Sequence, residues 1–196
     1  MIAPVAAGCG PDCAAFVAKW SEWWRLKTRH PLAILDCSED YLQVIGRNSR
    51  NMVRKADRLY VFRPMVYNDH LAEIDVINAS KAVRQGRPMS GWYTEPAQPS
   101  IPAHLCDTHS DVWHGAFCCS DDSLAAFARL ARVSDELGIL VSFLGHAEAS
   151  AAMNGMVAYL VNTAGVQRLN YLHMRSATDT LEAFKRRLGF QGVLYA

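Results

Sequence analysis

The second half of the chain, residues 108–196, alternates strand-like and helix-like segments, and this alternation constrains the fold more than any other feature. The apolar run 137–146 (LGILVSFLGH) predicts a buried strand, and residues 156–165 (MVAYLVNTAG) predict a helix closed by a glycine. A strand, a helix and a last strand are predicted at 167–174, 177–189 and 190–196. The pattern favours an α/β (α+β) fold with a mixed central sheet flanked by helices.

The first half, residues 1–93, is predicted to be mostly helical. Apolar spacing indicates helices at 13–30, at 38–59 with a break near Gly46, and at 70–85, with short strands at 32–36 and 59–67. Residues 94–107 contain three prolines and predict a connecting loop to the second half. Residues 123–133 (SLAAFARLARV) suit either a helix or a strand. We expect one compact domain, since 196 residues is a usual domain size.

Composition excludes some classes of protein. Lys and Arg total 20 against 19 for Asp and Glu, so the overall charge gives no argument for a nucleic acid or a membrane surface. No apolar run has the length of a membrane span, and the first residues do not resemble a secretory leader. The six cysteines lack a disulfide framework spacing, which predicts reduced thiols in a cytoplasmic protein. No metal site is expected, because the nearest candidates fit no zinc spacing: His104, Cys106, His109 and His114.

The last predicted helix ends in Lys185-Arg186-Arg187-Leu188-Gly189-Phe190. With the order of elements before it, this ending resembles the GNAT superfamily of N-acyltransferases, over roughly residues 108–196. In that superfamily the last helix commonly ends in Tyr-x-x-x-Gly-Phe, and the tyrosine often protonates the departing thiolate of coenzyme A. Lys185 stands at the tyrosine position here. A lysine at this position can stabilise or protonate the leaving group, bind a phosphate, or remain a solvated cation at a helix C-terminus.

The GNAT resemblance implies acetyl-CoA or another acyl-CoA as the donor and an amine as the acceptor. The superfamily's pyrophosphate loop (Gln/Arg-x-x-Gly-x-Gly/Ala) is absent, so the expected cofactor contacts are backbone groups around Asn154, Gly155 and Met156, at the start of the predicted helix. His146 and Glu148 follow the strand whose end would face the transfer centre. Either is a candidate catalytic base for the acceptor amine, and the alternative is a pair of loop residues without a catalytic role.

Two basic features suggest an anionic partner. Arg84, Gln85, Arg87 and Tyr93 gather donors and a planar ring around a turn, which predicts a binding site for an anionic or phosphate-bearing acceptor; a solvated helix end is the alternative. Four arginines recur on one face of the helix at 38–59, together with Lys55: Arg47, Arg50, Arg54 and Arg58. Such a stripe is either a solvated face or a contact for DNA or tRNA phosphates.

The sequence therefore predicts an acyltransferase acting on a small amine or a modified nucleotide. Two alternatives stay open. One is a nucleic-acid-modifying acyl- or aminoacyltransferase that acts on DNA or uses charged tRNA, because the Phe184-Lys185 pair also resembles the Fem-type aminoacyltransferases. The other is a non-catalytic nucleic-acid-binding module on the same fold.

Overall fold

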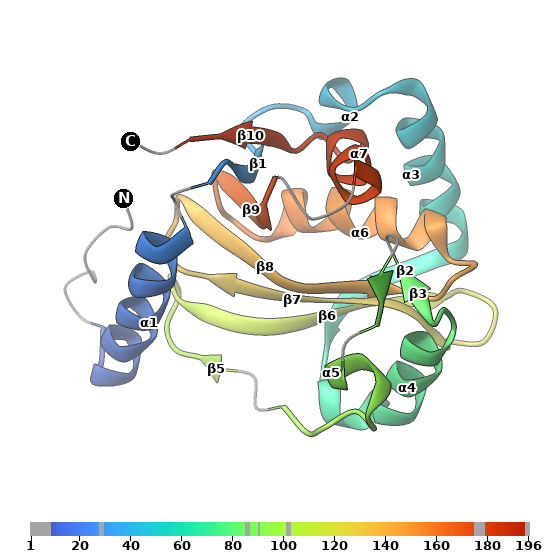
Figure 1. The fold of residues 1–196 in the computed structure, drawn as a ribbon, viewed down its shortest axis with the longest axis horizontal. Helices are drawn as coiled ribbons and strands as arrows, with labels where there is room; N and C mark the ends of the chain where they lie inside the picture. The colour runs from blue at the N-terminus through green and yellow to red at the C-terminus, as the bar shows by residue number, and fades with distance from the viewer. Residues whose placement is uncertain are drawn as a thin grey trace.

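The structure is a computed structural model that describes residues 9–27, 30–84, 87–89, 91–100, 103–174 and 179–194. Its centre is one mixed sheet with the strand order β10-β1-β9-β8-β7-β6-β2, and β5 pairs with β6 beside this path (Figure 1). The strands of this sheet are β1 Leu32–Asp36, β2 Tyr60–Met65, β5 Ala103–His104, β6 Ser110–Cys118, β7 Leu124–Arg132, β8 Leu137–Gly145, β9 Arg168–His173 and β10 Gln191–Val193. Only the β8–β9 pair is parallel among the described strand pairs.

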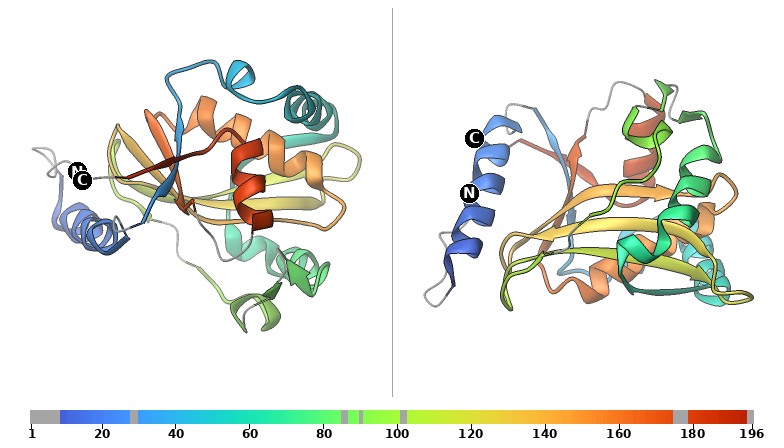
Figure 2. Two further views of the ribbon diagram at one scale, coloured as in Figure 1. Left: turned by 45° about the horizontal axis from the view of Figure 1, so that its top comes forward. Right: turned by 90° about the horizontal axis from the view of Figure 1, so that it is seen from below.

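The helices lie on both faces and at the ends of the sheet (Figures 1 and 2). They are α1 Pro11–Lys27, α2 Tyr41–Val44, α3 Arg47–Leu59, α4 Leu71–Ala79, α5 Gly91–Thr94, α6 Ser150–Thr163 and α7 Asp179–Arg187, with a 3₁₀ turn at Tyr67–His70. A separate hairpin joins β3 Val83–Arg84 and β4 Arg87–Pro88. The predicted α/β class, with a mixed central sheet flanked by helices, is confirmed.

Most of the segment 123–133 forms the strand β7, because the strands on both sides of it supply backbone hydrogen-bond partners along its length. β7 pairs antiparallel with β6 and with β8. Its side chains alternate between the two faces, so Ala126 and Ala128 lie in the cluster under α6, while Phe127 lies in the cluster under α4. The small alanine side chains allow α6 to pack closely on one face of the sheet, and Phe127 fills the wider space between the other face and α4. Tertiary pairing here outweighs the helix propensity of alanine.

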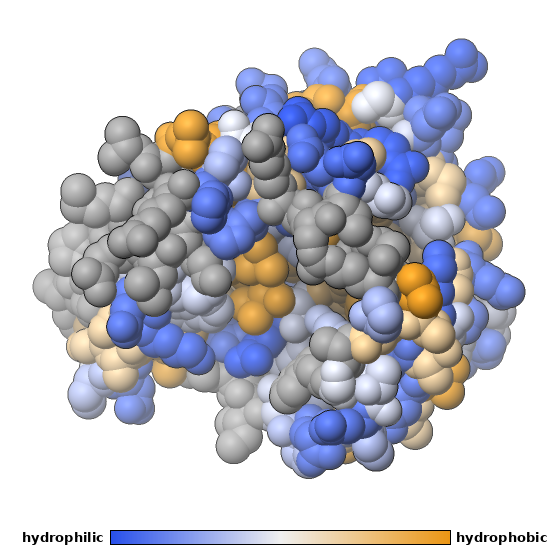
Figure 3. Space-filling view, in the orientation of Figure 1, coloured by the Kyte–Doolittle hydropathy of each residue, from blue (hydrophilic) through white to orange (hydrophobic). Residues whose placement is uncertain are grey.

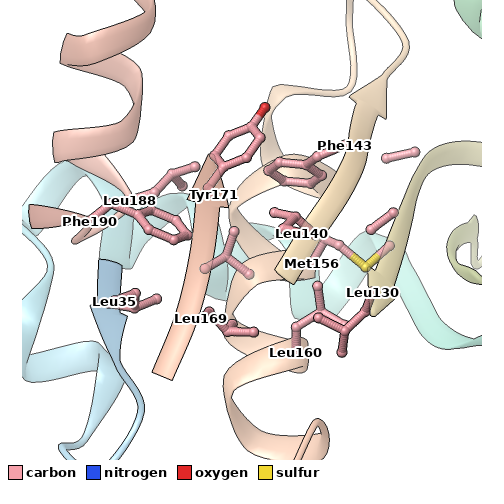
Figure 4. Packing of buried hydrophobic residues seen from close by; sticks show 14 of the residues in the cluster. Leu35, Leu130, Leu140, Phe143, Met156, Leu160, Leu169, Tyr171, Leu188 and Phe190 are labelled. Carbon is pink, nitrogen blue, oxygen red and sulfur yellow. The ribbon is translucent and has the colours of Figure 1, made fainter. Parts of the chain in front are cut away.

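The main core lies between the sheet and α6. Figure 4 shows Met156 and Leu160 of α6 beside Leu130, Leu140 and Leu169 of three adjacent strands. A second cluster of aromatic side chains packs α4 against the opposite face, and a third packs α1 near the ends of β7 and β8. These layers fix the position of α6 relative to β8.

The N-terminal half does not form a separate helical unit. β1 lies between β9 and β10, and β2 forms the other edge of the same sheet. Two hydrogen bonds hold the Pro-rich stretch against the first half of the chain. The Ala97 N–H donates to Asp75 Oδ1 at 2.7 Å, and the Ser100 N–H donates to Asn68 Oδ1 at 2.7 Å. Residues on both sides of 94–107 therefore build one sheet, to which the mostly helical first half contributes β1 and β2.

The helix after β8 begins at Ser150, six residues before the predicted start at Met156. Asn154 and Gly155 lie inside this helix, where their N–H groups belong to the helical ladder rather than to a ligand. Gly155 allows α6 to touch its neighbours: a Cβ atom there would lie 2.5 Å from Ala56 Cβ and 2.4 Å from Phe62 Cζ. Met156 is fully buried in the core.

Gly155→Ala tests this helix contact, because two effects predict opposite signs. Helix propensity alone favours alanine by about 1 kcal/mol. The clash with Ala56 and Phe62 requires the helices to move apart, and such overpacking costs about 1–3 kcal/mol. We expect the clash to dominate, so Gly155→Ala lowers the free energy of unfolding measured in urea. The control is Asn162→Ala at an exposed position of the same helix, with an expected change within about 0.5 kcal/mol. A stabilised Gly155→Ala variant would refute the contact.

Candidate functional site

The principal cleft opens where β8 and β9 separate. The two strands pair only at Leu137–Arg168, Gly138–Leu169 and Ile139–Asn170, although β8 continues to Gly145. Beyond this point lies a cleft of about 520 Å³. Its walls come from five places: α3, Lys81 after the end of α4, the end of β8 with the residues after it, the first turns of α6, and α7 with the residue after it. Parallel strands that diverge leave a space that neither a side chain nor a third strand closes completely.

β9 turns away from β8 through a local distortion that Asn170 stabilises. Leu172 has a φ of 55°, which is unusual for a residue with a side chain, and the pairing of β9 with β1 shifts register nearby. The buried Asn170 side chain donates to the Ala33 and Leu172 carbonyl oxygens, both at 3.2 Å, and accepts from the Leu172 N–H at 3.1 Å. Asn170 thus supplies hydrogen bonds that a regular ladder would have made.

Lys185 satisfies the carbonyl groups further along β9. Its Nζ donates to the Tyr171 carbonyl oxygen at 2.9 Å and to the His173 carbonyl oxygen, and lies 4.6 Å from the centre of the Tyr171 ring. The side chain is 2% exposed, and burial lowers the pKa of Lys185 to about 8. Lys185 is not among the described residues that line the cleft. This position differs from the expected one at the leaving group, and it also excludes a solvated cation.

The cleft combines an apolar floor with a basic rim. Phe143, Met153 and Phe184 line its interior, and Figure 4 shows the Phe143 ring beside Tyr171. Lys81 and Arg187 line it as exposed cations, and among the described residues neither forms a salt bridge. The arrangement suits a ligand that is apolar at one end and anionic at the other.

The N-terminus of α6 adds further donors. Ser150 begins the helix and lines the cleft, and the preceding residue, Ala149, has no side-chain capping bond. Helix geometry leaves the N–H groups of residues 150–152 without acceptors inside the helix, and the helix dipole adds partial positive charge there. This first turn, and not the predicted Asn154-Gly155 pair, is the part of α6 suited to an anion. Asn154 still lines the cleft, although its Nδ2 donates to the Ser150 carbonyl oxygen at 3.0 Å.

His146 lies in the cleft and Glu148 does not. The His146 N–H donates to the Ala125 carbonyl oxygen at 2.8 Å, which holds the residue directly after β8. Its Nδ1 accepts from the Glu148 N–H at 3.3 Å. That bond favours the neutral tautomer with its proton on Nε2, which makes Nε2 a hydrogen-bond donor. Glu148 is exposed and is not among the described lining residues, so the structure brings only one of the two predicted bases to the cleft.

A second hollow, of about 380 Å³, lies beyond the C-terminal end of α4. Tyr93 lines it, together with Asp75, Asn78 and Glu95. Asn78 is 6% exposed, and its Oδ1 has no hydrogen-bond partner among the described residues. The hollow therefore offers two carboxylates beside a tyrosine, which suits a cation.

The other residues predicted around Tyr93 are only partly described. Arg84 and Arg87 pair with each other in the β3–β4 hairpin, and the positions of their side chains lie outside the described part of the chain. Gln85 lies outside the described residues altogether. The predicted anion-binding corner therefore stays a prediction.

Three of the four arginines predicted to form a stripe on α3 are exposed, and the fourth, Arg50, contacts the backbone of the chain. Arg47, Arg54 and Arg58 are exposed, and hydrophilic side chains cover the upper part of the face shown in Figure 3, where α2, α3 and α7 lie. Arg50 instead donates from Nη1 to the Ile45 carbonyl oxygen at 2.8 Å and to the Leu42 carbonyl oxygen at 3.2 Å. Arg50 thus closes the end of α2, and its contact with an external phosphate would break those bonds.

The structure also assembles a cluster that the sequence did not indicate: Cys9, Cys13, Cys106 and His109. Two of the histidines considered with Cys106 behave differently. His114 is buried on β6, and burial lowers the pKa of its imidazole to about 4. The His104 side chain lies outside the described part of the structure.

No protein-family model matches the sequence, and no curated protein resembles it significantly. Solved structures do. The structure of L-PGS from Bacillus licheniformis matches with a TM-score of 0.55 and 12% identity, over 83% of this chain and 58% of that one. The C-terminal (DUF2156) domain of a protein named as a lysylphosphatidylglycerol synthetase, from Agrobacterium fabrum, matches with a TM-score of 0.52 and 14% identity, over 83% and 57%. The chain shares their fold.

The chain spans under three fifths of the length of those two neighbours. A GCN5-related N-acetyltransferase from Kribbella flavida matches more weakly, with a TM-score of 0.43, 11% identity and coverage of 83% of this chain and 54% of that one. Within the described residues, no helix combines the length and the apolar character that crossing a membrane requires.

Lys185→Met tests the structural role of the buried lysine. The variant leaves the Tyr171 and His173 carbonyl oxygens without their donor, and we expect a loss of about 1–3 kcal/mol in the free energy of unfolding. Because the pKa of Lys185 in the folded chain, about 8, lies below the ordinary lysine value of 10.5, burial of the charge opposes folding most below pH 8 and is relieved as the pH rises toward 10.5. The stability advantage of the wild type over the variant should grow across this range.

Arg186→Met is the matched control for Lys185→Met. Arg186 is exposed and pairs with Glu182 at 2.8 Å, so its loss should cost less than about 1 kcal/mol and should show no trend between pH 8 and pH 10.5. Urea unfolding of the three proteins at several pH values measures both quantities. Equal behaviour of the two variants would contradict the role given to Lys185.

Proposed function

We propose that the chain is an acyltransferase that binds an activated, phosphate-bearing acyl donor in the cleft between β8 and β9. The observation that carries the proposal is the position of the uncapped first turn of α6 in the wall of this cleft. Backbone N–H groups at a helix N-terminus bind phosphate, and Lys81 and Arg187 add positive charge nearby. The apolar interior suits the acyl portion of the same molecule.

Acetyl-CoA or another acyl-CoA is the proposed donor. In the reaction the amine nitrogen of the acceptor attacks the thioester carbonyl carbon and the C–S bond breaks. The proton that the amine gives up passes through solvent water to the departing thiolate, so coenzyme A is released as the free thiol. Of the residues predicted to be catalytic, His146 is the one that lines the cleft in which this reaction would take place. In its neutral form the Nε2–H donates to the carbonyl oxygen or to the leaving sulfur, where negative charge develops. Positioning of the two substrates supplies the rest of the rate enhancement.

The proposed acceptor is an amine that carries a second positive charge. The second hollow presents the carboxylates of Asp75 and Glu95, which would accept from an ammonium group. Residues of the α4 end separate it from the cleft, and the Ala147 N–H donates to Ser80 Oγ at 3.1 Å across this boundary. A small cationic amine fits these groups better than the anionic acceptor predicted from Arg84 and Arg87, and better than a modified nucleotide.

Aminoacyl transfer from charged tRNA is the second candidate. The neighbour from Agrobacterium fabrum is named as a lysylphosphatidylglycerol synthetase, a name that implies transfer of an aminoacyl group to a lipid, and the neighbour from Bacillus licheniformis is named L-PGS. In this chain α3 both lines the cleft, through Asn48 and Met52, and presents Arg54 and Arg58 to solvent. A tRNA whose acceptor end enters the cleft would find phosphate contacts on the same helix. Action on DNA, or a non-catalytic nucleic-acid module, would use this arginine surface without the cleft.

Calorimetry with acetyl-CoA and free CoA tests the proposed donor. We expect saturable binding that weakens about fivefold in Lys81→Ala and in Arg187→Ala, because each removes an interaction of about 1 kcal/mol at the rim. Lys19→Ala on α1, away from the cleft, should bind as the wild type does. If neither acetyl-CoA nor free CoA binds to the wild-type chain, an acyl-CoA donor is rejected. Binding of charged tRNA that weakens in an Arg54→Glu, Arg58→Glu double variant would then favour the second candidate.

A panel of amines tests the proposed acceptor class. With acetyl-CoA as donor, polyamines and lysine should react faster than amino sugar phosphates, because the Asp75 and Glu95 carboxylates attract a second cation and repel a phosphate. Glu95→Gln should raise the KM for the preferred amine about three- to tenfold with little change in kcat, as expected when a binding contact is lost. Glu136→Gln, on the distant β7–β8 turn, is the control. If the phosphorylated amines react faster, the acceptor is anionic and the proposed cationic acceptor class is wrong.

A further inference from the structure

Four metal-ligating side chains meet where α1 approaches the turn between β5 and β6. Cys9 precedes α1 and Cys13 lies in its first turn, whereas Cys106 and His109 belong to the β5–β6 turn. One ligand atom from each residue lies within 4.8 Å of every other. Cys9 Sγ lies 3.6 Å from Cys106 Sγ and 3.6 Å from His109 Nδ1, and Cys106 Sγ lies 3.1 Å from the same nitrogen.

Two of these separations match four ligand atoms around a shared centre, and the third, between Cys106 Sγ and His109 Nδ1, is a few tenths of an ångström shorter than the expected value. Zinc binds thiolate sulfur at about 2.3 Å and imidazole nitrogen at about 2.0–2.1 Å, so a tetrahedral site places its ligand atoms about 3.5–3.8 Å apart. A disulfide would instead join two sulfurs at about 2.05 Å and leave the other two groups unused. Three thiols with one imidazole form a soft ligand set that selects zinc among the abundant divalent cations.

We propose that Cys9, Cys13, Cys106 and His109 bind one Zn²⁺ in a closed tetrahedral site that fastens α1 to the sheet. On binding, each of the three thiols gives up its proton, three Zn–S bonds form, and His109 donates its Nδ1 lone pair while Nε2 keeps the ring proton. Four protein ligands leave no open position, so the metal is structural and does not act on a substrate. None of the four residues lines the cleft or the second hollow.

The surroundings of the cluster support a buried structural metal. Cys13 is 1% exposed and His109 is 3% exposed, so solvent has little access to two of the ligands. The backbone N–H groups of Thr108 and His109 donate toward Cys106 Sγ, as outer hydrogen bonds do around zinc-bound thiolates. Phe16 of α1 meets the His109 ring edge-on, with the ring centres 6.4 Å apart, and helps to fix its orientation.

α1 is the element that such a site would secure. It packs at one end of the sheet, where Trp20 joins Leu32, Ile139 and neighbouring apolar side chains (Figure 1). The metal would add a cross-link between segments that lie about half the chain apart in sequence. We therefore expect zinc to contribute to the stability of the chain and not to donor or acceptor binding.

Elemental analysis of the full chain, purified under reducing conditions without a chelator or a histidine tag, tests the proposal. We expect about one zinc per chain in the wild type and in Cys119→Ser, an exposed cysteine outside the cluster. Cys106→Ser and His109→Asn should retain less than about a fifth of that zinc. Removal of zinc by a chelator should lower the melting temperature of the wild type, and added Zn²⁺ should restore it.

Cobalt substitution keeps the proposal testable if a variant fails to fold. Co²⁺ in the wild-type chain should give the visible bands of tetrahedral coordination and intense thiolate charge-transfer bands in the near ultraviolet. Three results would each overturn the proposal: wild-type protein without zinc and without these cobalt bands, full zinc content in folded Cys106→Ser, or a Cys9–Cys106 disulfide found by mass spectrometry in protein that was kept reduced.

Discussion

The separation of β8 from β9 after only three residue pairs is the feature on which the rest of the site depends. Two strands that part inside a sheet leave carbonyl groups without partners, and buried carbonyl groups require donors. Asn170 supplies them at the bend in β9, and Lys185 supplies them further along. Phe143, Tyr171 and Phe184 pack into the widening gap, with ring centres about 6 Å apart. The remaining space is the cleft.

The helices around the cleft make the distribution of charge on this side of the molecule asymmetric. α6 lies close to α3 because Gly155 has no side chain, and this packing directs the first turn of α6 into the cleft wall. Positive charge from Lys81 and Arg187 lies at the rim, whereas the second hollow, beyond the end of α4, carries carboxylates. Neighbouring sites of opposite charge suit a transferase whose donor is anionic and whose acceptor is cationic.

Much of the fold could be predicted from the sequence, because the apolar runs of β8 and β9 and the glycine ends of the last two helices give strong local signals. The start of α6 could not: residues 149–152 are alanine and serine without a capping side chain, and the pattern becomes clearly helical only at Met156. The ambiguous segment at 123–133 was decided by its two strand neighbours, which no local pattern reveals.

The candidate site was harder to predict. His146 follows from its place after an apolar strand, but the burial of Lys185 depends on the distant backbone of β9 and has no signature in the sequence. Tyr93 was predicted beside Arg84 and Arg87, whose side chains lie outside the described part of the structure, and no sequence signal indicated that Asp75 and Glu95 lie in the same hollow. The cysteine and histidine cluster joins two pairs separated by about half the chain, so each pair by itself matched no zinc spacing.

Hydrogen exchange of the backbone, measured by mass spectrometry with and without saturating coenzyme A, tests the central claim most directly. The account predicts slower exchange in peptides that cover 143–154 and 180–188, because the ligand would occupy the cleft and accept from the free N–H groups of α6. Exchange on the outer face of α1 should not change. Protection confined to other elements, or none at a saturating concentration, would contradict the assignment of this cleft as the donor site.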